Sequence, residues 1–330
     1  MIVVPCYNEE EVLSSTIEAL SDELDRLMED ELVSRRSCLL FVDDGSRDST
    51  WQLLEQHARS NRLVTAVKLA RNAGHQNALL CGLQRAGERG ADCVISIDAD
   101  LQDDIRVIRS FITLYRDGCD IVYGVREDRE SDSWFKRTSA VGFYRVMARL
   151  GVKLEHNHAD CRLLSRRALE HLKQFREVNL FLRGLIPLLG LPAARVYYSR
   201  KPRTAGTSKY PLGRMLSLAF EGVTSFTAKP IRFVTGAGFV LFVCSLLAGL
   251  YTVISKWSGT AVSGWTSLML SLWFIGGVQL LAVGLIGEYV GKIYSEVKQR
   301  PRYLIEKELD TASEMPLSVP ASRLTDAGIS

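Results

Sequence analysis

Short apolar runs alternate with longer amphipathic stretches over the first part of the chain. The apolar runs favour β-strands at residues 2–5, 38–42, 63–69, 93–97 and 120–124. The stretches between them predict helices at residues 11–28, 49–59, 76–89 and 105–116. Short buried strands that alternate with helices are typical of a doubly wound, mostly parallel sheet. The pattern therefore predicts an α/β domain over residues 1–200.

Two long uncharged stretches, residues 233–255 and residues 257–287, follow this domain. Because about 20 apolar residues cross the hydrocarbon core of a bilayer, they predict two transmembrane helices within residues 231–290. A buried helical pair in a soluble protein is the alternative. Lysine and arginine flank both outer ends of the pair, whereas the connecting loop offers only Lys256. The positive-inside rule then predicts a multi-pass protein of the inner (cytoplasmic) membrane, with the α/β domain and both termini in the cytoplasm.

Two further segments complete the predicted organisation. Residues 201–230 carry a basic loop and then an apolar stripe, which favours a juxtamembrane amphipathic helix. Residues 291–330 form a cytoplasmic tail, and its short, polar end is expected to be disordered.

Charge and motif content exclude several classes of protein. The formal net charge of the 330 residues is +3, and no aromatic–basic pattern for base stacking occurs, so no nucleic-acid partner is expected. The 7 cysteines are scattered without a C-x-x-C pair, which is typical of a reducing compartment. The absence of G-x-G-x-x-G after the first strand, and of any P-loop, disfavours dinucleotide oxidoreductases and P-loop NTPases.

Polar clusters directly follow four of the predicted strands. They occupy residues 5–10 (P-C-Y-N-E-E), 43–46 (D-D-G-S), 71–76 (R-N-A-G-H-Q) and 98–102 (D-A-D-L-Q). Ligands of doubly wound sheets bind beyond the carboxyl ends of the strands. We therefore expect the four clusters to converge on one site.

Two of these clusters carry paired carboxylates. Asp98 and Asp100 have the spacing and the oxygen ligands to bind Mg²⁺ or Mn²⁺, which would neutralise charge on a diphosphate leaving group. A lone D-x-D is more often a solvated acidic turn, but here it closes an apolar strand beside three other polar clusters. Asp43 and Asp44 could form a turn before the next helix, or accept hydrogen bonds from a nucleobase or ribose, and we expect both roles.

Taken together, V-P-C-Y-N-E-E, V-D-D-G-S-R-D-S-T, R-N-A-G-H-Q and D-A-D-L-Q-D resemble the family-2 inverting glycosyltransferases with the GT-A fold. The resemblance is closer to their polyprenyl-phosphate branch, the dolichol-phosphate mannose synthases and bactoprenol glucosyltransferases, and runs from about residue 1 to residue 305. It implies a metal-binding pair at Asp98 and Asp100, the latter also catalytic. It further implies that the nucleotide is contacted by Pro5, Tyr7, Glu9, Asp43, Asp44, Asp98 and Gln102.

A cationic segment precedes the first predicted membrane helix. A phosphate monoester has its second pKa at about 6, so a polyprenyl phosphate acceptor is already anionic and needs a cationic clamp more than a general base. Arginine can grip phosphate with two donors and lysine as a point charge. The segment resembles the acceptor loop of the family, R-x-x-G-x-S-K, and the predicted phosphate-binding residues are Arg200, Arg203, Ser208 and Lys209. A basic patch that serves only lipid headgroups is the alternative.

A further polar segment, residues 156–162, contains two histidines and Asp160. A zinc site is one interpretation of this composition. The resemblance instead implies that Asp160 is the catalytic carboxylate. It could act as a base, position the acceptor, or form a salt bridge with Arg162 that orders the loop, and the anionic acceptor makes a base partly redundant.

The combined prediction is an enzyme that transfers a sugar from a nucleotide-sugar to undecaprenyl or another polyprenyl phosphate, with inversion, for surface polysaccharide modification. UDP-sugars are favoured donors. Glucose is favoured because residues 178–184 (V-N-L-F-L-R-G) and 209–212 (K-Y-P-L) resemble bactoprenol glucosyltransferases. Mannose and amino-arabinose donors are alternatives. A homo-oligomer and a flippase partner are further expectations.

Three rival functions remain at this point. A processive polysaccharide synthase would need more membrane helices and a Q-x-x-R-W motif, which the sequence lacks. A non-catalytic membrane scaffold that senses nucleotide-sugars would not need the acidic pair together with the basic loop. A soluble metal hydrolase is disfavoured by the predicted hairpin.

Overall fold

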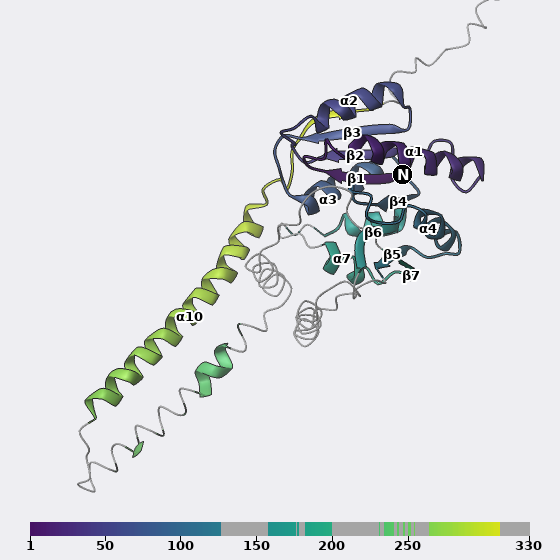
Figure 1. Ribbon diagram of the computed structural model, residues 1–330. Coiled ribbons are helices and arrows are strands. Elements are labelled where there is room, and N and C mark those ends of the chain that lie inside the picture. Colours follow the sequence, from purple (N-terminus) through teal and green to yellow (C-terminus); the bar gives the residue numbers. More distant parts are fainter. Residues whose placement is uncertain are drawn as a thin grey trace, which may run out of the picture.

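The computed structural model describes residues 1–126, 158–175, 177, 182–199 and 264–310, together with 231, 234–240, 243, 247, 250, 251 and 254. Its centre is a sheet of 8 strands in the order β7-β5-β6-β4-β1-β2-β3-β8 (Figure 1). The strands are β1 (Ile2–Cys6), β2 (Leu39–Asp43), β3 (Val64–Leu69), β4 (Cys93–Ser96), β5 (Ile121–Arg126), β6 (His158–Ser165), β7 (Ala193–Tyr198) and β8 (Ile305–Leu309).

The sheet is mostly parallel at its centre. Strand β1 pairs in parallel with β2 and β4, and β2 pairs in parallel with β3. Strand β6 runs antiparallel between β4 and β5, and β5 pairs in parallel with β7. The predicted α/β class is confirmed, and β1 to β5 lie within two residues of the predicted bounds. Strands β6, β7 and β8 were not predicted.

Helices cover both faces of this sheet, which is why β1 to β4 are almost continuously apolar. On one face, α1 (Leu13–Glu29), α2 (Thr50–Ser60) and α4 (Val107–Arg116) bury Ile2, Val4 and Phe41. On the other face, α3 (His75–Glu88), α6 (Arg166–Leu172) and α7 (Leu182–Leu188) bury Val3 and Val42. The alternation of neighbouring residues between faces follows from the two-residue period of a strand.

The close approach of α3 to the sheet depends on Gly82. A Cβ at this position would lie 2.3 Å from Val3 Cγ1 and 3.0 Å from Val42 Cγ2. We therefore expect Gly82→Ala to lower the free energy of unfolding by about 1–3 kcal/mol, the usual cost of overpacking a core, measured by denaturation in detergent solution. Gly87→Ala in the same helix is the matched control, because its Cβ would meet only Leu169, at 3.9 Å. Equal effects of the two substitutions would contradict this packing.

The chain returns to the sheet after the two predicted membrane helices. Strand β8 pairs antiparallel with β3 at the sheet edge. Glu308 of β8 forms ion pairs with Arg85 of α3 at 3.3 Å and with Arg89 at 2.9 Å. Residues 305–309 were predicted to belong to the tail, because I-E-K-E-L is short and charged. An exposed edge strand allows such a sequence. The end of the predicted tail, residues 311–330, lies outside the described residues.

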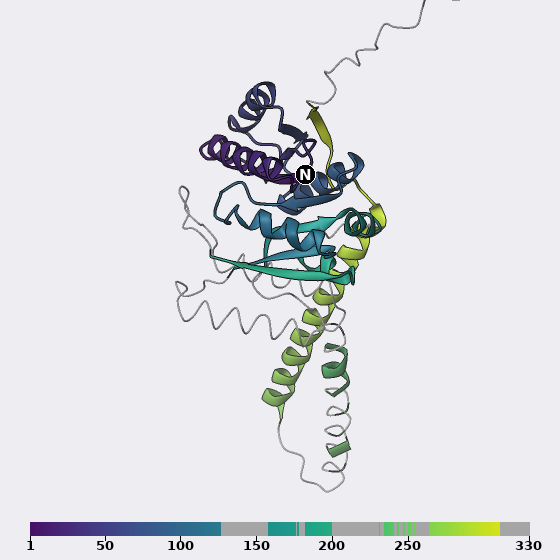
Figure 2. The ribbon, with the colours of Figure 1, turned by 90° about the vertical axis from the view of Figure 1, so that its right-hand side faces the viewer.

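The second predicted membrane helix is α10 (Trp265–Lys298), which has 34 residues. At 1.5 Å per residue it is about 50 Å long, more than the roughly 30 Å of a hydrocarbon core. Within the described residues, its segment Phe274–Lys298 is the one helix that is long and apolar enough to cross a membrane. Figures 1 and 2 show α10 projecting away from the sheet. The first predicted membrane helix is described only in part, and its described residues are helical.

Candidate active site

The loops after β1 and β2 are joined by backbone-to-side-chain hydrogen bonds. Asn8 N donates to Ser46 Oγ at 2.9 Å, and Arg47 N donates to Asn8 Oδ1 at 2.9 Å. Glu9 N donates to Thr50 Oγ1 at 2.9 Å. The structure thus brings the first two predicted clusters together at the carboxyl edge of the sheet.

Within these loops, the predicted nucleotide residues differ in exposure. Pro5 is buried in β1, and Glu9 is half-buried. Tyr7 is 39% exposed and offers its ring at the surface of the site. Asp43 is fully buried, and its Oδ1 accepts from Ser46 N at 3.0 Å. Asp43 Oδ2 has no hydrogen-bond partner among the described residues, and burial raises the pKa of this carboxyl.

Asp44 turns towards the third cluster. Its two carboxylate oxygens accept from Ala73 N at 2.6 Å and from Gly74 N at 2.9 Å. Gly45 between the two loops has φ +69°, and a Cβ there would lie 2.7 Å from the carbonyl carbon of Arg71. Asp44 therefore fixes the loop that leads into α3, whereas the turn predicted for this pair precedes α2.

The loop after β4 carries Asp98, Asp100 and Gln102. Burial raises the pKa of Asp98 to about 6, and nearby carboxylates, including Asp160 and Asp103, add to the shift while His75 opposes it. Asp100 Oδ1 accepts from the backbone N–H of Gln102 at 3.2 Å. Gln102 is buried, and its Nε2 has no hydrogen-bond partner among the described residues. A half-buried carboxylate with a raised pKa is one that a cation would stabilise.

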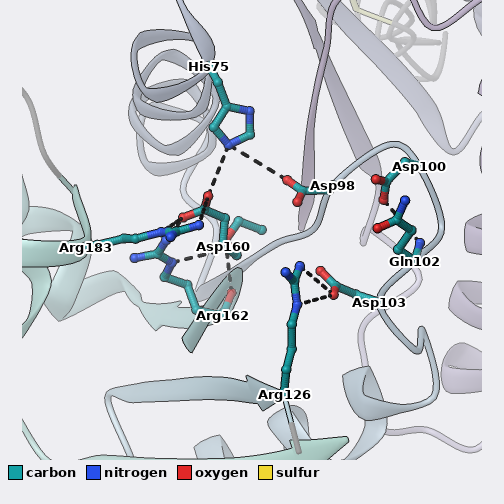
Figure 3. Close-up of polar contacts among 10 residues, drawn as sticks. His75, Asp98, Asp100, Gln102, Asp103, Arg126, Asp160, Arg162 and Arg183 are labelled. Atoms are coloured by element: carbon teal, nitrogen blue, oxygen red, sulfur yellow. Dashed lines mark hydrogen bonds and ion pairs between the residues drawn. The ribbon is translucent and has the colours of Figure 1, made fainter. Parts of the chain in front are cut away.

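Asp160 lies in β6 rather than in a loop, and it is the centre of a charged network (Figure 3). Arg162 pairs with its Oδ1. Arg183 donates from Nε to Oδ1 at 3.1 Å and from Nη2 to Oδ2 at 2.9 Å. His75 Nε2 lies 3.4 Å from Oδ2. Although burial opposes the effect, the hydrogen bond with His75 and the charges of Arg162 and Arg183 lower the pKa of Asp160 well below its ordinary value.

His75 links this network to the loop after β4. It is the first residue of α3, directly after Gly74, whose φ of +91° turns the chain into the helix. Its Nε2 lies 3.8 Å from Asp98 Oδ1. The two carboxylates raise the pKa of His75, although burial opposes them. His75 belongs to the predicted R-N-A-G-H-Q cluster, but it was not among the predicted site residues.

Arg183 is the second site residue that the sequence alone did not identify. It belongs to the V-N-L-F-L-R-G segment, which drew attention only as a mark of resemblance to bactoprenol glucosyltransferases. Its position in the first turn of α7 brings it to Asp160, 23 residues earlier in the chain. The sequence signal for Arg183 is an arginine at the start of an apolar segment. A surface arginine with no role in the site would give the same pattern.

Three of these side chains could hold a cation. One ligand atom each from His75, Asp98 and Asp160 lies within 4.8 Å of the others. Both oxygens of Asp160 already accept from Arg183, whereas Asp98 meets only His75 among the described cations, at 3.8 Å. The charge balance therefore favours Asp98 over Asp160 as a ligand of a divalent cation.

Arg200, Arg203, Ser208 and Lys209 lie outside the described residues. Asp103, beside Gln102, is buried and accepts from Arg126 Nε at 3.1 Å and Nη2 at 2.9 Å (Figure 3). This ion pair ties the loop after β4 to the end of β5.

Two family models match the sequence. Residues 1–173 match the model described as "Glycosyl transferase family 2", and they contain all the strand-end clusters and Asp160. The chain belongs to glycosyl transferase family 2. Residues 229–293 match the model described as "GtrB C-terminal hairpin". The hairpin and the apolar helix α10 together indicate that this family-2 enzyme associates with a membrane.

Relatives of this family-2 transferase span nearly its whole length. "Uncharacterized glycosyltransferase YkoT" of Bacillus subtilis (strain 168) is 55% identical over 96% of this chain and 94% of that protein. The "SfII prophage-derived bactoprenol glucosyl transferase" of Shigella flexneri is 39% identical over 93% of this chain and 97% of that protein. The resemblance to the polyprenyl-phosphate branch is thereby confirmed. Among solved structures, mannosyl-3-phosphoglycerate synthase from Rubrobacter xylanophilus has a TM-score of 0.45 at 16% identity, and covers 70% of this chain and 73% of that one.

Proposed function

We propose that this family-2 transferase moves glucose from UDP-glucose to undecaprenyl phosphate, with inversion, at the cytoplasmic face of the inner membrane. The observation that carries the proposal is the Asp98–His75–Asp160–Arg183 network at the carboxyl edge of the sheet, in a chain that also has a membrane hairpin. This network has the carboxylate of Asp98 at one end and the guanidinium group of Arg183 at the other. A carboxylate suits a cation-bound diphosphate, and a guanidinium group suits an incoming phosphate.

The nucleotide is assigned to the loops after β1 and β2. Tyr7 is exposed there and can stack on a base. Asp43 Oδ2, buried without a hydrogen-bond partner among the described residues, can accept from a base N–H. Pro5, Glu9 and Asp44 shape the same loops, Asp44 through the backbone N–H groups of the next loop.

Mg²⁺ or Mn²⁺ fits the loop after β4. Asp98 and Asp100 would hold the ion, with Gln102 nearby, because Asp98 is half-buried, has a raised pKa and pairs only with His75 among the described basic side chains. When bound, the ion would neutralise the charge that develops on the leaving nucleoside diphosphate.

The transfer needs no strong base on the protein. A phosphate oxygen of the acceptor attacks the anomeric carbon, the bond from that carbon to the diphosphate oxygen breaks, and the electron pair leaves with the nucleoside diphosphate. Asp160 is a poor base because a hydrogen bond with His75 and the charges of Arg162 and Arg183 hold it in its ionised form. Its assigned role is therefore to position His75 and Arg183. Single displacement at the anomeric carbon inverts its configuration.

The membrane arrangement follows from the charge pattern. Lysine and arginine flank the outer ends of the hairpin, so both termini and the catalytic sheet are assigned to the cytoplasm. The basic residues of the 200–209 segment would then meet the lipid phosphate at the membrane surface. Flipping of the product, and assembly into a homo-oligomer, are further parts of the proposal.

Transfer of label into organic-extractable lipid tests the reaction. The full-length protein in detergent, with undecaprenyl phosphate, is given a panel of labelled UDP- and GDP-sugars with Mn²⁺ or Mg²⁺. We expect UDP-glucose to label the lipid, excess chelator to abolish labelling, and added divalent cation to restore it. Labelling by another sugar would replace glucose as the donor. No lipid labelling by a protein that still binds UDP would favour the nucleotide-sugar-sensing scaffold.

A further inference from the structure

The Arg183 side chain is partly exposed and uses two of its nitrogen atoms on its carboxylate partner. Arginine has five N–H donors. Arg183 uses Nε and Nη2 on Asp160, at 3.1 and 2.9 Å. Its side chain is 42% exposed, and no other residue that the structure describes accepts a hydrogen bond from it. Within the part of the chain that the structure describes, the other donors of this planar group have no acceptor.

Two guanidinium groups, those of Arg162 and Arg183, pair with Asp160. Asp98, whose ligand oxygen lies within 4.8 Å of that of Asp160, adds a second carboxylate nearby. The Arg162 side chain is only 1% exposed, so its charge lies inside the protein, away from a bound anion. Arg183 is therefore the member of the pair that can reach a bound anion.

The order of the strands separates the Asp160–Arg183 pair from the nucleotide loops. The nucleotide loops follow β1 and β2, Asp98 follows β4, and Asp160 lies on β6, the next strand outward. Figure 3 shows Asp98 and Arg183 on opposite sides of Asp160. An anion on Arg183 would therefore lie across Asp160 from the diphosphate end of a donor held at Asp98.

The position of α7 agrees with an acceptor that arrives from the membrane. Figure 1 shows α7 in the lower part of the domain, and α10 extends downwards from the domain. The start of α7 is tied to α3, because Leu182 N donates to Gln76 Oε1 at 3.1 Å. Leu182, Leu185 and Ile186 are fully buried. Arg183 thus projects from a fixed backbone and not from a free loop.

We propose that Arg183 binds the phosphate group of the lipid acceptor at the point of attack, and that Asp160 holds its guanidinium group in the required orientation. This assignment rests on the proposed function, and it adds a phosphate-binding residue on the rigid sheet domain to those predicted in the 200–209 segment. A guanidinium group grips phosphate with two parallel donors, whereas an ammonium group offers a point charge. Lysine at this position should therefore not replace arginine.

The test compares acceptor and donor binding in Arg183→Lys and Arg183→Ala. Binding of geranyl phosphate, a short polyprenyl phosphate, to the UDP-saturated full-length protein is measured by calorimetry, together with the affinity for UDP. We expect both variants to weaken geranyl phosphate binding by about 10- to 100-fold, because a lost hydrogen bond between charged groups is costly. The affinity for UDP should change less than about 3-fold. The KM for undecaprenyl phosphate should rise in parallel with the loss of binding.

Arg167→Lys is the matched control. Arg167 is an exposed arginine of α6 that pairs with Asp120 at 3.5 Å, away from the network. Arg167→Lys should leave the affinity for geranyl phosphate and the KM for undecaprenyl phosphate unchanged. The thermal unfolding of every variant is recorded to identify folding defects.

Each outcome bears on the assignment. Unchanged geranyl phosphate binding in folded Arg183→Lys and Arg183→Ala protein would overturn it. An equal loss of UDP affinity would assign Arg183 to the donor diphosphate and overturn it as well. Phosphate binding is measured without turnover. Loss of binding in the variants of a protein that transfers no sugar would therefore keep the phosphate site and reject the proposed function.

Discussion

Replacement of Asp98 by asparagine is expected to reduce sugar transfer to undecaprenyl phosphate by about 10²–10³-fold, the usual effect of removing one group that stabilises transition-state charge. The carboxylate lies at the end of β4, 3.8 Å from His75, and is the charged group best placed to hold a divalent cation. Asparagine keeps its shape but loses its charge. The initial rate of lipid labelling at saturating UDP-glucose and Mn²⁺ measures the effect.

The same substitution should not destabilise the protein. The pKa of Asp98 is raised to about 6 in the fold, above its ordinary value, so the stabilising protonated form is lost as pH rises through about 6. Above that pH the ionised carboxylate of the metal-free protein opposes folding, and a neutral side chain relieves this. We expect the thermal unfolding temperature of Asp98→Asn without metal at pH 7.5 to equal or exceed that of the unsubstituted protein.

Asp92→Asn is the matched control for this substitution. The Asp92 side chain is 83% exposed and pairs with Arg166 at 3.1 Å, at the other end of β4. It should leave both the rate and the unfolding temperature unchanged. Transfer by Asp98→Asn within about 3-fold of the unsubstituted rate would mean that another group carries the metal, or that the reaction does not use one.

Replacement of Asp160 by alanine is expected to lower the free energy of unfolding by about 3–5 kcal/mol, the cost of removing one partner of a buried ion pair. Arg162 is 1% exposed, and its Nη1 has no hydrogen-bond partner among the described residues. Without Asp160, Arg162 would keep a buried charge with no carboxylate on it, and Arg183 would lose both its hydrogen bonds to Asp160. Denaturation in detergent, run beside the transfer assay, measures the loss.

This prediction changes how an inactive Asp160 variant is interpreted. Loss of transfer together with this loss of stability would mean that Asp160 positions its partners. A variant such as Asp160→Asn that unfolds like the unsubstituted protein, yet transfers no sugar to an ionised acceptor, would contradict that role and favour a base. The pKa of Asp160 is held well below its ordinary value. Protonation of this group should therefore not lower the transfer rate between about pH 5 and about pH 8, the usual range of an enzyme assay.

The local pattern of the sequence determined the elements of the central fold. Strands β1 to β5 and helices α1 to α4 are encoded by runs with a clear two-residue or 3.6-residue period, and each was predicted to within two residues. The strand-end clusters followed from the same pattern, because parallel strands present their carboxyl ends at one edge. The hairpin followed from length and charge alone, and a family model matches it.

The tertiary structure decided which charges meet. Strand β6 was missed because Asp160 and Arg162 make its sequence polar. A salt bridge between them was one of the roles that the sequence left open, and the fold shows this pair buried inside the sheet. Strand β8 was missed because an exposed edge strand carries no apolar run. His75, Asp160 and Arg183 come from α3, β6 and α7, and they meet because the crossover connections bring these elements to one edge. A sequence period reports only neighbours within an element, so it determined where Asp98 would lie, whereas the chain topology determined that Arg183 would lie across Asp160 from it.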